Sequence, residues 1–332
     1  MEYQKLSQDQ RRAYLDNAQL WDAYLDAQSQ AYRCRGGMRW RSIQDKDYLY
    51  RVMDSRVSRG LGPRSEATER AYATFSAEKA QSAQRVTSLE NQVHRQSRIC
   101  RAMDLGQLPR LSAKILRSLT KVGLDRKTLT VVGTHALFAY EALAGAFFPS
   151  PLLAIRDIDL LWDARLRLKI ASEIPPQGLI ALLKKVDRSF AVLKGSPFRV
   201  VNDEGFMVDL LQGSADMRVA SVPSFATEDD FVAAEADLRW LISSRHVRAT
   251  VLDENGVPAI MVAPDPRAFA LHKSWLAERV NRDPVKKERD AAQSVAVARL
   301  VRDLLPQYPF SDAALRMFPR TLRDRFLTSS PA

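Results

Sequence analysis

The chain has 332 residues, of which 46% are apolar, and its 50 Lys and Arg outnumber 39 Asp and Glu to give a net charge of +11. This apolar fraction is typical of a folded protein with a sizeable core and excludes a fully disordered chain. No apolar run approaches the roughly 18 residues that a membrane span requires, so we expect no membrane partner. The polar N-terminus lacks the apolar core of a secretion signal, and Cys34 and Cys100 form no CxxC motif. We therefore expect a cytoplasmic protein without a disulfide framework.

The positive charge is concentrated in the first third of the chain. Residues 1–120 contain 21 Lys and Arg against 13 Asp and Glu, a net charge of +8, whereas residues 121–332 have a net charge of +3. This asymmetry favours a polyanionic partner that binds the first third. The alternative is ordinary solubility charge on amphipathic helices.

The first third also has its own pattern of elements. Apolar residues at spacings of three and four predict an amphipathic helix over the first 30 residues. A Gly-Gly pair ends it, and the aromatic and basic mixture up to Arg51 predicts a short strand or turn. Two glycines and a proline predict a loop at 58–65, and Ser65 begins a long polar helix that runs to about Met103.

The later elements follow from periodicity and turn residues. We expect, in chain order, a helix at 110–124, a strand, a Gly-Thr turn and a helix ending near Gly145, a strand at 152–163, a helix from Pro176 to Leu193, hairpins with turns at Asn202–Gly205 and Glu254–Gly256, and helices broken at Pro284 and Pro306–Pro309. The sequence thus predicts an α+β fold. A mixed sheet forms a core at 121–265, between a basic, mainly helical region at 1–120 and a helical region at 266–332.

Two aspartates stand two residues apart inside an apolar stretch. Asp157 and Asp159 project from one face of the expected strand, while Ile158 points to the other. Like charges this close repel, and a chain that stabilises such a pair normally supplies a cation. Hard oxygen ligands at this spacing suit Mg²⁺ or Mn²⁺. The alternative is that one aspartate caps a turn and the other is solvated at a strand end.

Three features follow one another along the chain. Gly133 and Thr134 form a turn between a strand and a helix, where backbone N–H groups and a hydroxyl can hold phosphate oxygens. The aspartate pair comes next, and Asp209 follows as a lone acid in a later strand. Three acids on adjacent strands can bind two divalent ions, which clamp a nucleotide's phosphates and activate an incoming hydroxyl.

This order of turn, acidic pair and single later acid resembles the DNA polymerase β-like nucleotidyltransferase superfamily, over roughly residues 130–212. The resemblance to a bacterial nucleotidyltransferase-like family of uncharacterised proteins, related to toxin-type nucleotidyltransferases, extends over most of the chain. It rests on the stretches GGMRWRSI, LGPRSEATE, VVGTHALFAYEALAG, RDIDLLWD, VDLL and APDPRAFALHKSWLAERVNRDPVKKERDAAQ.

The resemblance implies a role for each matching residue. Gly133 and Thr134 match the turn that holds the triphosphate, although superfamily members commonly carry Ser or Gly where this chain has Thr134. Asp157 and Asp159 match the paired metal ligands. Asp209 matches the third acid, which ligates the metal beside the attacking hydroxyl and draws off its proton. The implied reaction transfers a nucleoside monophosphate from an NTP to a hydroxyl, with Mg²⁺ or Mn²⁺, and releases pyrophosphate.

Three lysines of the C-terminal region are further candidates for nucleotide binding. We expect Lys273, Lys286 or Lys287 to reach the β- or γ-phosphate from the helical region. The alternative for Lys286 is a surface ion pair with Asp290, four residues later on the same helix.

Four other polar residues near these motifs are interpreted more simply. Arg156 either contacts substrate or screens the acids, and Asp163 is a strand-end or capping residue. His135 and His272 are interpreted as packing or capping residues, because this chemistry needs no histidine ligand.

The acceptor is inferred from the basic first third. Arg35, Arg39 and Arg41 are the candidate nucleic-acid contacts, and neighbouring aromatic residues can stack bases, which favours RNA and in particular a tRNA end. These aromatic residues are Trp21, Tyr32, Trp40, Tyr48 and Tyr50. A small molecule such as an aminoglycoside, or a protein side chain, is an alternative acceptor. A non-catalytic nucleotide-binding module and a toxin–antitoxin pair are alternative roles.

Overall fold

The structure is a computed structural model that describes residues 3–53, 58–124, 129–153, 157–162, 178–213, 234–236 and 238–329. The chain divides into two compact units. The hairpin unit is Arg12–Met103, and the main unit comprises Met1–Arg11 and Asp104–Ala332. These boundaries differ from the sequence-based regions 1–120, 121–265 and 266–332, since both the helix at Arg110–Lys121 and the C-terminal helices belong to the main unit.

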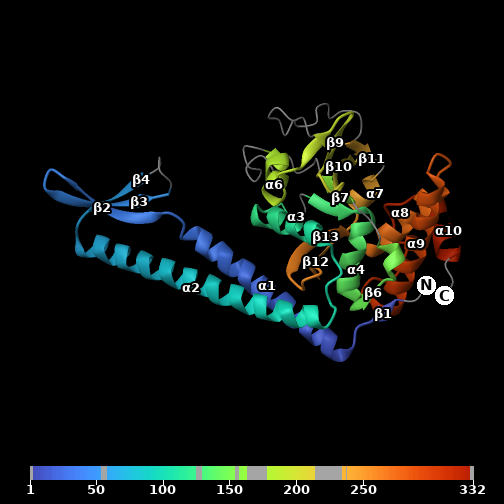
Figure 1. Ribbon diagram of the computed structural model, residues 1–332, viewed down its shortest axis with the longest axis horizontal. Coiled ribbons are helices and arrows are strands. Elements are labelled where there is room, and N and C mark those ends of the chain that lie inside the picture. The colour runs from blue at the N-terminus through green and yellow to red at the C-terminus, as the bar shows by residue number, and fades with distance from the viewer. Residues whose placement is uncertain are drawn as a thin grey trace. The chain divides into compact units, whose positions relative to one another are not determined.

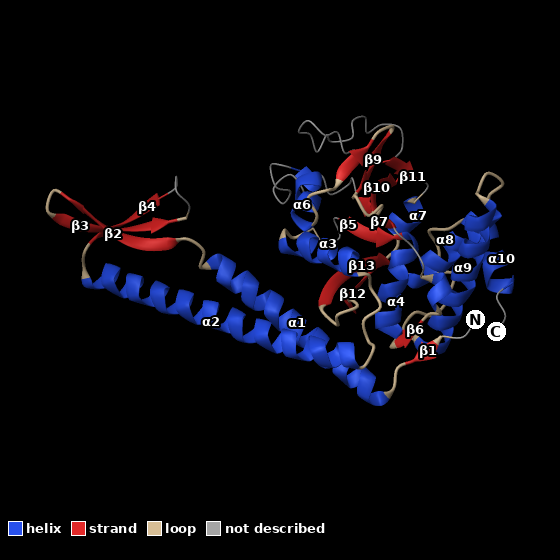
Figure 2. Ribbon diagram, in the orientation of Figure 1, coloured by secondary structure: helices blue, strands red, loops and turns tan. Residues whose placement is uncertain are grey.

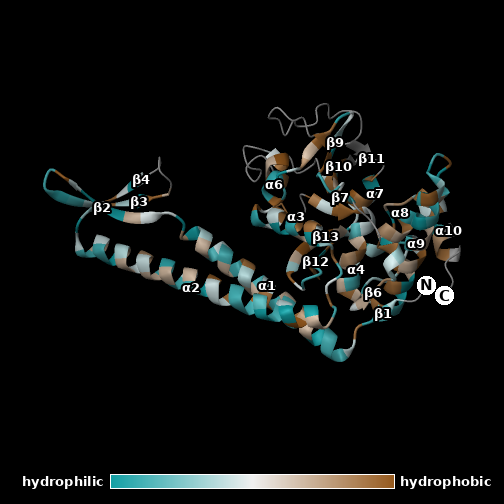
Figure 3. Ribbon diagram, in the orientation of Figure 1, coloured by the Kyte–Doolittle hydropathy of each residue, from teal (hydrophilic) through white to brown (hydrophobic). Residues whose placement is uncertain are grey.

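The hairpin unit is built on two long helices, α1 (Gln8–Arg33) and α2 (Glu66–Ala102). Asn17 of α1 donates a hydrogen bond to Cys100 of α2, and Gln30 of α1 accepts one from Arg85 of α2. Later positions on α1 therefore meet earlier positions on α2, so the helices are antiparallel, as Figure 1 shows. Much of α2 is hydrophilic along its length in Figure 3, which agrees with the long polar helix that the sequence predicts.

A three-stranded antiparallel sheet joins these helices. Its strands are β2 (Gly37–Ile43), β3 (Lys46–Val52) and β4 (Ser58–Pro63), in the order β2-β3-β4 (Figure 2). The loop predicted at 58–65 is therefore wrong for Ser58–Pro63. Glycine and proline are tolerated there because β4 is an edge strand whose pairing shifts register at Leu49/Tyr50.

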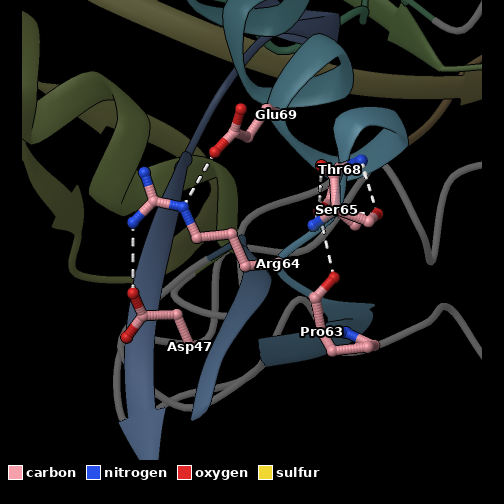
Figure 4. A network of polar contacts seen from close by, with 6 residues as sticks. All are labelled: Asp47, Pro63, Arg64, Ser65, Thr68 and Glu69. Atoms are coloured by element: carbon pink, nitrogen blue, oxygen red, sulfur yellow. Dashed lines mark hydrogen bonds and ion pairs between the residues drawn. The ribbon is translucent and has the colours of Figure 1, made fainter.

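The start of α2 is fixed by local hydrogen bonds, shown in Figure 4. The Ser65 hydroxyl accepts from the backbone N–H of Thr68, and the Thr68 hydroxyl accepts from the backbone N–H of Ser65. This reciprocal capping satisfies two N–H groups that the helix itself leaves unpaired. The predicted helix start is confirmed, with Thr68 as the reciprocal partner.

The main unit contains a mixed sheet of six strands in which β5, β7, β10, β9 and β8 are successive neighbours and β11 pairs with β10. β7 runs parallel to β10, and β5 runs antiparallel to β7. A separate hairpin of β12 and β13 has its turn where predicted. The strands are β1 (Gln4–Lys5), β5 (Leu129–Val132), β6 (Ala146–Phe147), β7 (Asp157–Trp162), β8 (Ala191–Leu193), β9 (Ser196–Val201), β10 (Met207–Gly213), β11 (Ala234–Ala236), β12 (His246–Leu252) and β13 (Pro258–Pro264).

Helices flank these strands, so the predicted α+β class and mixed sheet are confirmed. α8 packs on α9, and α4 packs on the β12–β13 hairpin. The helices and short 3₁₀ turns are α3 (Arg110–Lys121), η1 (Gly133–His135), α4 (Ala136–Ala144), η2 (Ser150–Leu152), α6 (Gly178–Val186), α7 (Arg239–Ser243), α8 (Pro266–Glu278), α9 (Pro284–Leu304) and α10 (Arg320–Ser329).

The helix expected from Pro176 to Leu193 ends early. α6 stops at Val186, and residues 191–193 form β8. The Asp187 carboxylate accepts hydrogen bonds from both the backbone N–H and the hydroxyl of Ser189. Such a local turn offers the backbone an alternative to helix, and it redirects the chain into the sheet.

The core of the main unit lies between the mixed sheet, the β12–β13 hairpin and the helices around them. Ile158, Leu160 and Val208 are fully buried on the core side of β7 and β10. Among the described helices, none is both long enough and apolar enough to cross a lipid bilayer. The apolar face of the sheet holds β7 and β10 in place, and their opposite face carries both acidic residues and the apolar Leu161 and Leu211.

Candidate active site

Three carboxylates lie on two neighbouring strands of the mixed sheet. β7 carries Asp157 and Asp159, and Asp209 of β10 is paired in register with Asp159. Figure 1 shows these strands side by side. The alternation of the strands places all three acids opposite the buried Ile158 and Leu160. Asp157, Asp159 and Asp209 line one cavity of about 460 Å³, so the structure brings the three predicted acids together.

The turn at Gly133 closes against this acidic group. Val132 of β5 pairs with Asp159, and the chain then turns at Gly133 with a φ of 64°. A Cβ atom at Gly133 would lie 2.1 Å from Oδ2 of Asp159. Both the left-handed backbone and this close approach require glycine. Gly133 therefore serves two purposes, because it directs η1 along the cavity and leaves room for the Asp159 carboxylate.

Asp159 has a strongly raised pKa. Burial and, to a smaller extent, the nearby carboxylates of Asp157 and Asp209 raise its pKa to about 7, while Lys273 and Arg199 oppose the shift. Desolvation and like charges both disfavour the ionised carboxylate. The three carboxylates therefore repel one another on the acidic side of the cavity, and a cation bound between them would relieve this repulsion.

Arg199 is a functional candidate that the sequence analysis did not identify. It lies opposite Asp209 in the β9–β10 pairing, and its guanidinium donates two hydrogen bonds to the Asp209 carboxylate, at 2.7 and 2.6 Å. The predicted hairpin places Arg199 and Asp209 on adjacent strands, but a four-residue turn at Asn202–Gly205 would pair Arg199 with Val208, so the predicted turn is one residue off the observed register. Arg199 also lines the cavity.

The basic side of the cavity comes from α8, α9 and the turn between them. Lys273 is 4% exposed and donates a 2.6 Å hydrogen bond to Asp290, which also accepts from Arg282 at 2.9 Å. Burial lowers the pKa of Lys273, while Asp290 acts to raise it. Lys273 thus lines the cavity, but Asp290 holds its ammonium group.

The other two predicted lysines differ in their position relative to the cavity. Lys286 is exposed and lines the cavity, whereas Lys287 is not among the residues that line it. Arg279 and Arg289 line the cavity as well, and the Nε of Arg289 is buried without a hydrogen-bond partner among the described residues. Such an arginine is suited to an anionic ligand. No sequence motif distinguished Arg289 from the other basic residues of this helix.

Thr134 has a structural partner in addition to its predicted role. It is 4% exposed, and its hydroxyl accepts a 3.0 Å hydrogen bond from Gln293 of α9. Gln293 also donates to the carbonyl of Leu152. This contact fixes the Gly133–Thr134 turn to α9, the helix that carries Lys286 and Arg289.

Two polar residues and two histidines were also singled out near the acidic motif. Arg156 and Asp163 lie outside the described residues. His135 and His272 are buried, which lowers their pKa to about 4 and about 3, respectively. Both therefore stay neutral at physiological pH, which agrees with packing roles.

The predicted nucleic-acid contacts lie in the hairpin unit. Arg39 and Arg41 are exposed and occupy alternate positions of β2, so they share one face of its sheet. Arg35 precedes β2, and its guanidinium lies over the ring of Tyr32, 4.0 Å from the ring centroid.

The carboxylates fit a divalent cation in their chemistry. They are hard oxygen donors on adjacent strands, and burial together with the neighbouring carboxylates raises the pKa of Asp159. In the described part of the chain, however, no three His, Cys, Asp or Glu side chains are arranged as a complete metal site. Both oxygens of Asp209 accept hydrogen bonds from Arg199.

Comparison with known proteins identifies the family of the chain. A family model described as nucleotidyltransferase matches residues 110–319, more than half of the chain. The chain therefore belongs to this nucleotidyltransferase family and is an enzyme of nucleotidyl transfer. The matched segment lies wholly within the main unit and contains every residue of the cavity. Neither a curated protein nor a solved structure matches the chain.

Proposed function

We propose that the protein transfers a nucleoside monophosphate from an NTP to a hydroxyl of RNA in a reaction that depends on Mg²⁺ or Mn²⁺. The observation that carries this proposal is the division of one cavity into an acidic side, formed by Asp157, Asp159 and Asp209, and a basic side on α8 and α9. Metal-bound phosphates need both kinds of surface.

The acidic side is proposed to hold the metal. Asp157, Asp159 and Asp209 would bind it through their carboxylate oxygens. When bound, the metal supplies charge neutralisation at the phosphates and lowers the pKa of the attacking hydroxyl. Arg199 keeps the Asp209 carboxylate oriented in the absence of metal, and its hydrogen bonds must be released or shared for Asp209 to act.

The basic side is proposed to hold the triphosphate. Arg289 and Lys286 face the cavity and would contact the β- and γ-phosphates, while Asp290 keeps Lys273 and Arg282 in position. The backbone N–H groups of the Gly133–Thr134 turn are further donors for phosphate oxygens. Lys287 does not line the cavity, so a direct phosphate contact is proposed for Lys286 in its place.

In the proposed reaction one bond to the α-phosphorus forms and another breaks. The acceptor oxygen attacks the α-phosphorus, the bond from that phosphorus to the bridging oxygen of the β-phosphate breaks, and pyrophosphate leaves. Asp209 is proposed to take the proton of the acceptor hydroxyl. The basic side chains stabilise the negative charge that develops on the leaving group.

RNA is proposed as the acceptor because the hairpin unit carries exposed arginines beside aromatic residues. Arg39 and Arg41 share a sheet face, and Arg35 lies at the start of the same sheet. Arginine contacts to phosphate supply affinity, and an unpaired RNA end, such as that of a tRNA, presents a terminal hydroxyl.

The test is incubation of the full chain with each labelled NTP, Mg²⁺ and total cellular RNA, followed by gel electrophoresis. We expect labelled RNA with the wild-type protein and none with Asp159→Ala, whose fold is checked by circular dichroism. Undiminished transfer by Asp159→Ala would contradict the proposed site. Label in protein or in a small molecule, with none in RNA, would contradict the proposed acceptor.

A further inference from the structure

The three-stranded sheet of the hairpin unit has two unlike faces. Trp40 and Arg51 lie on the face toward α2, where Trp40 packs on Tyr72 and the guanidinium of Arg51 lies 4.0 Å from the ring centroid of Phe75. Leu49 is fully buried on the same face. This face therefore packs on α2, and the Trp40 ring is already engaged by Tyr72 and by the Arg64 guanidinium.

The opposite face, here called the outer face, has a different composition. The pairing of β2 with β3 and β4 places the following side chains on it: Arg39, Arg41, Ile43, Lys46, Tyr48, Tyr50 and Val52. Within the described residues of β2, β3 and β4 the one acid is Asp47, and it lies on the α2 side, where it accepts hydrogen bonds from Ser42 and Arg64. The outer face therefore presents three cations without a counter-charge on its strands.

Aromatic and guanidinium groups are layered on this outer face. A Cβ atom at Gly60 of β4 would lie 3.5 Å from Cε1 of Tyr50, so the tyrosine ring lies across the backbone of the neighbouring strand. The Arg41 guanidinium lies over that ring, 5.1 Å from its centroid. Gly60 leaves the space that a larger residue would fill, and the layer ends in an exposed guanidinium.

We propose that the outer face binds single-stranded RNA, with bases stacking on Tyr48 and on the Arg41 guanidinium that Tyr50 supports, while Arg39, Arg41 and Lys46 contact phosphates. The face carries positive charge and lacks acidic side chains on its strands, which complements a polyanion. Aromatic rings and arginine planes stack unpaired bases of any sequence, whereas paired bases are already stacked within a duplex. The choice of RNA over DNA rests on the proposed function.

The experiment measures binding of a fluorescent single-stranded RNA 12-mer to the full chain by anisotropy, over a series of salt concentrations, in EDTA and without NTP. These conditions separate binding from transfer, so Asp159→Ala should bind as the wild type does. If the outer face does not bind RNA, the proposed transfer reaction is not thereby refuted. If the protein does not transfer nucleotides, the measured RNA binding still tests the outer face.

Two double variants divide the proposal into its parts. Arg39→Gln with Arg41→Gln should reduce the slope of log affinity against log salt by about 1.4, because each phosphate contact on a single strand contributes roughly 0.7. Tyr48→Leu with Tyr50→Leu should lower affinity about tenfold or more at constant salt slope, since only stacking is lost. Tyr48→Phe with Tyr50→Phe keeps both rings and should bind within about twofold of wild type.

The matched control is Arg95→Gln with Arg98→Gln, which removes the same charge from exposed positions on α2. It should leave RNA affinity within about twofold of wild type. If the control lost as much RNA affinity as the variant with Arg39→Gln and Arg41→Gln, binding would depend on overall charge and not on the outer face. That result would overturn the proposal. Wild-type binding by the leucine variant, tighter binding of duplex RNA or of single-stranded DNA, or equal binding of an acidic peptide would also overturn it.

Discussion

Two networks of charged side chains, one in each unit, are similar in size and opposite in surroundings. In the main unit Asp290 joins Lys273 and Arg282, and its side chain is 0% exposed. In the hairpin unit Arg64 joins Asp47 and Glu69, and its side chain is 56% exposed (Figure 4). Both networks have good hydrogen-bond distances, so geometry alone does not distinguish them.

The two networks differ in whether water can solvate a charge whose partner has been removed. A buried charge that loses its partner is left in a medium that cannot solvate it, whereas an exposed charge is solvated at once. The buried network therefore fixes the position of single side chains around the cavity. The exposed charges of the hairpin unit act through their combined electrostatic potential. Such a potential suits the recruitment of a polyanion better than the precise positioning that catalysis needs.

The largest effect is expected for Asp290→Asn. It leaves Lys273 and Arg282 without their shared carboxylate, so we expect a loss of about 3–5 kcal/mol in the free energy of unfolding. Lys273, whose pKa burial already lowers, would respond by losing its proton. Urea denaturation at pH 7 measures the change. A loss no larger than that of a surface variant would show that the buried network is not the stabilising feature that its burial indicates.

A smaller effect is expected from the pH dependence of Glu141, a buried acid in the main unit. Its carboxylate accepts a 2.6 Å hydrogen bond from the backbone N–H of Phe148, and burial raises its pKa to about 8. The folded protein keeps a proton that the unfolded chain releases above roughly pH 4.5. The stabilisation is therefore complete at low pH and is lost as pH rises toward 8.

Glu141→Gln should remove this slope, since the glutamine oxygen still accepts the Phe148 hydrogen bond but does not titrate. The free energy of unfolding of wild type should fall by up to about 4 kcal/mol between pH 5 and pH 8 relative to the variant. Denaturation curves at four pH values measure this difference. Parallel pH profiles for the two proteins would contradict a buried, protonated Glu141.

The next effect concerns nucleotide affinity. Gly133→Ala places a methyl group 2.1 Å from Asp159 Oδ2, so it displaces that carboxylate, and we expect NTP affinity to fall about tenfold or more. Thr134→Ala loses a hydroxyl that Gln293 also uses, with a cost of roughly 0.5–1.5 kcal/mol. Calorimetric titration with a non-hydrolysable NTP analogue and Mg²⁺ compares the two variants.

Gly205→Ala is the matched control, since Gly205 has a φ of 77° and open space around its Cβ position. It introduces the same backbone strain without a collision and should bind the analogue as wild type does. If all three alanine variants had equal affinities, the turn at Gly133 would not be part of the nucleotide site.

The smallest effect is expected for Asp47→Asn in the exposed network. The hydrogen bonds from Ser42 and Arg64 lower the pKa of Asp47, but water replaces them readily at this surface. We expect an unchanged melting temperature within experimental error. A loss of stability comparable to that of Asp290→Asn would remove the distinction between the two networks.

Much of the fold and the acidic side of the site could be predicted from the sequence, because the signals are local. The strand, glycine turn and helix around Gly133, the hairpin at Asn202–Gly205 and the spacing of Asp157 and Asp159 are each contained in a few consecutive residues. The strand β4 was missed because its glycines and proline resemble a loop until the neighbouring strand is known.

The basic side could not be predicted in the same way. Lys273 carries a sequence signal for phosphate binding, but only the packing of α8 on α9 shows that Asp290 holds it. Thr134 and Gln293 are far apart in the sequence, and nothing local indicates their hydrogen bond. Arg289 differs from the other basic residues of α9 only in its position on the helix, which directs it to the cavity.

The central claim is that the three carboxylates on β7 and β10 hold a divalent metal together with an NTP, and electron paramagnetic resonance of Mn²⁺ tests it most directly. Mn²⁺ is titrated with wild type, Asp159→Asn and Asp203→Asn in the presence of a non-hydrolysable NTP analogue. Asp203 is an exposed acid in the β9–β10 turn, outside the cavity, so it serves as the control.

We expect wild type and Asp203→Asn to bind Mn²⁺ saturably, beyond the amount that the nucleotide alone binds. Asp159→Asn should lose this binding, because a neutral amide replaces the buried carboxylate at the centre of the acidic group. Equal Mn²⁺ binding by wild type and Asp159→Asn, or no binding by wild type beyond that of the nucleotide, would contradict the account.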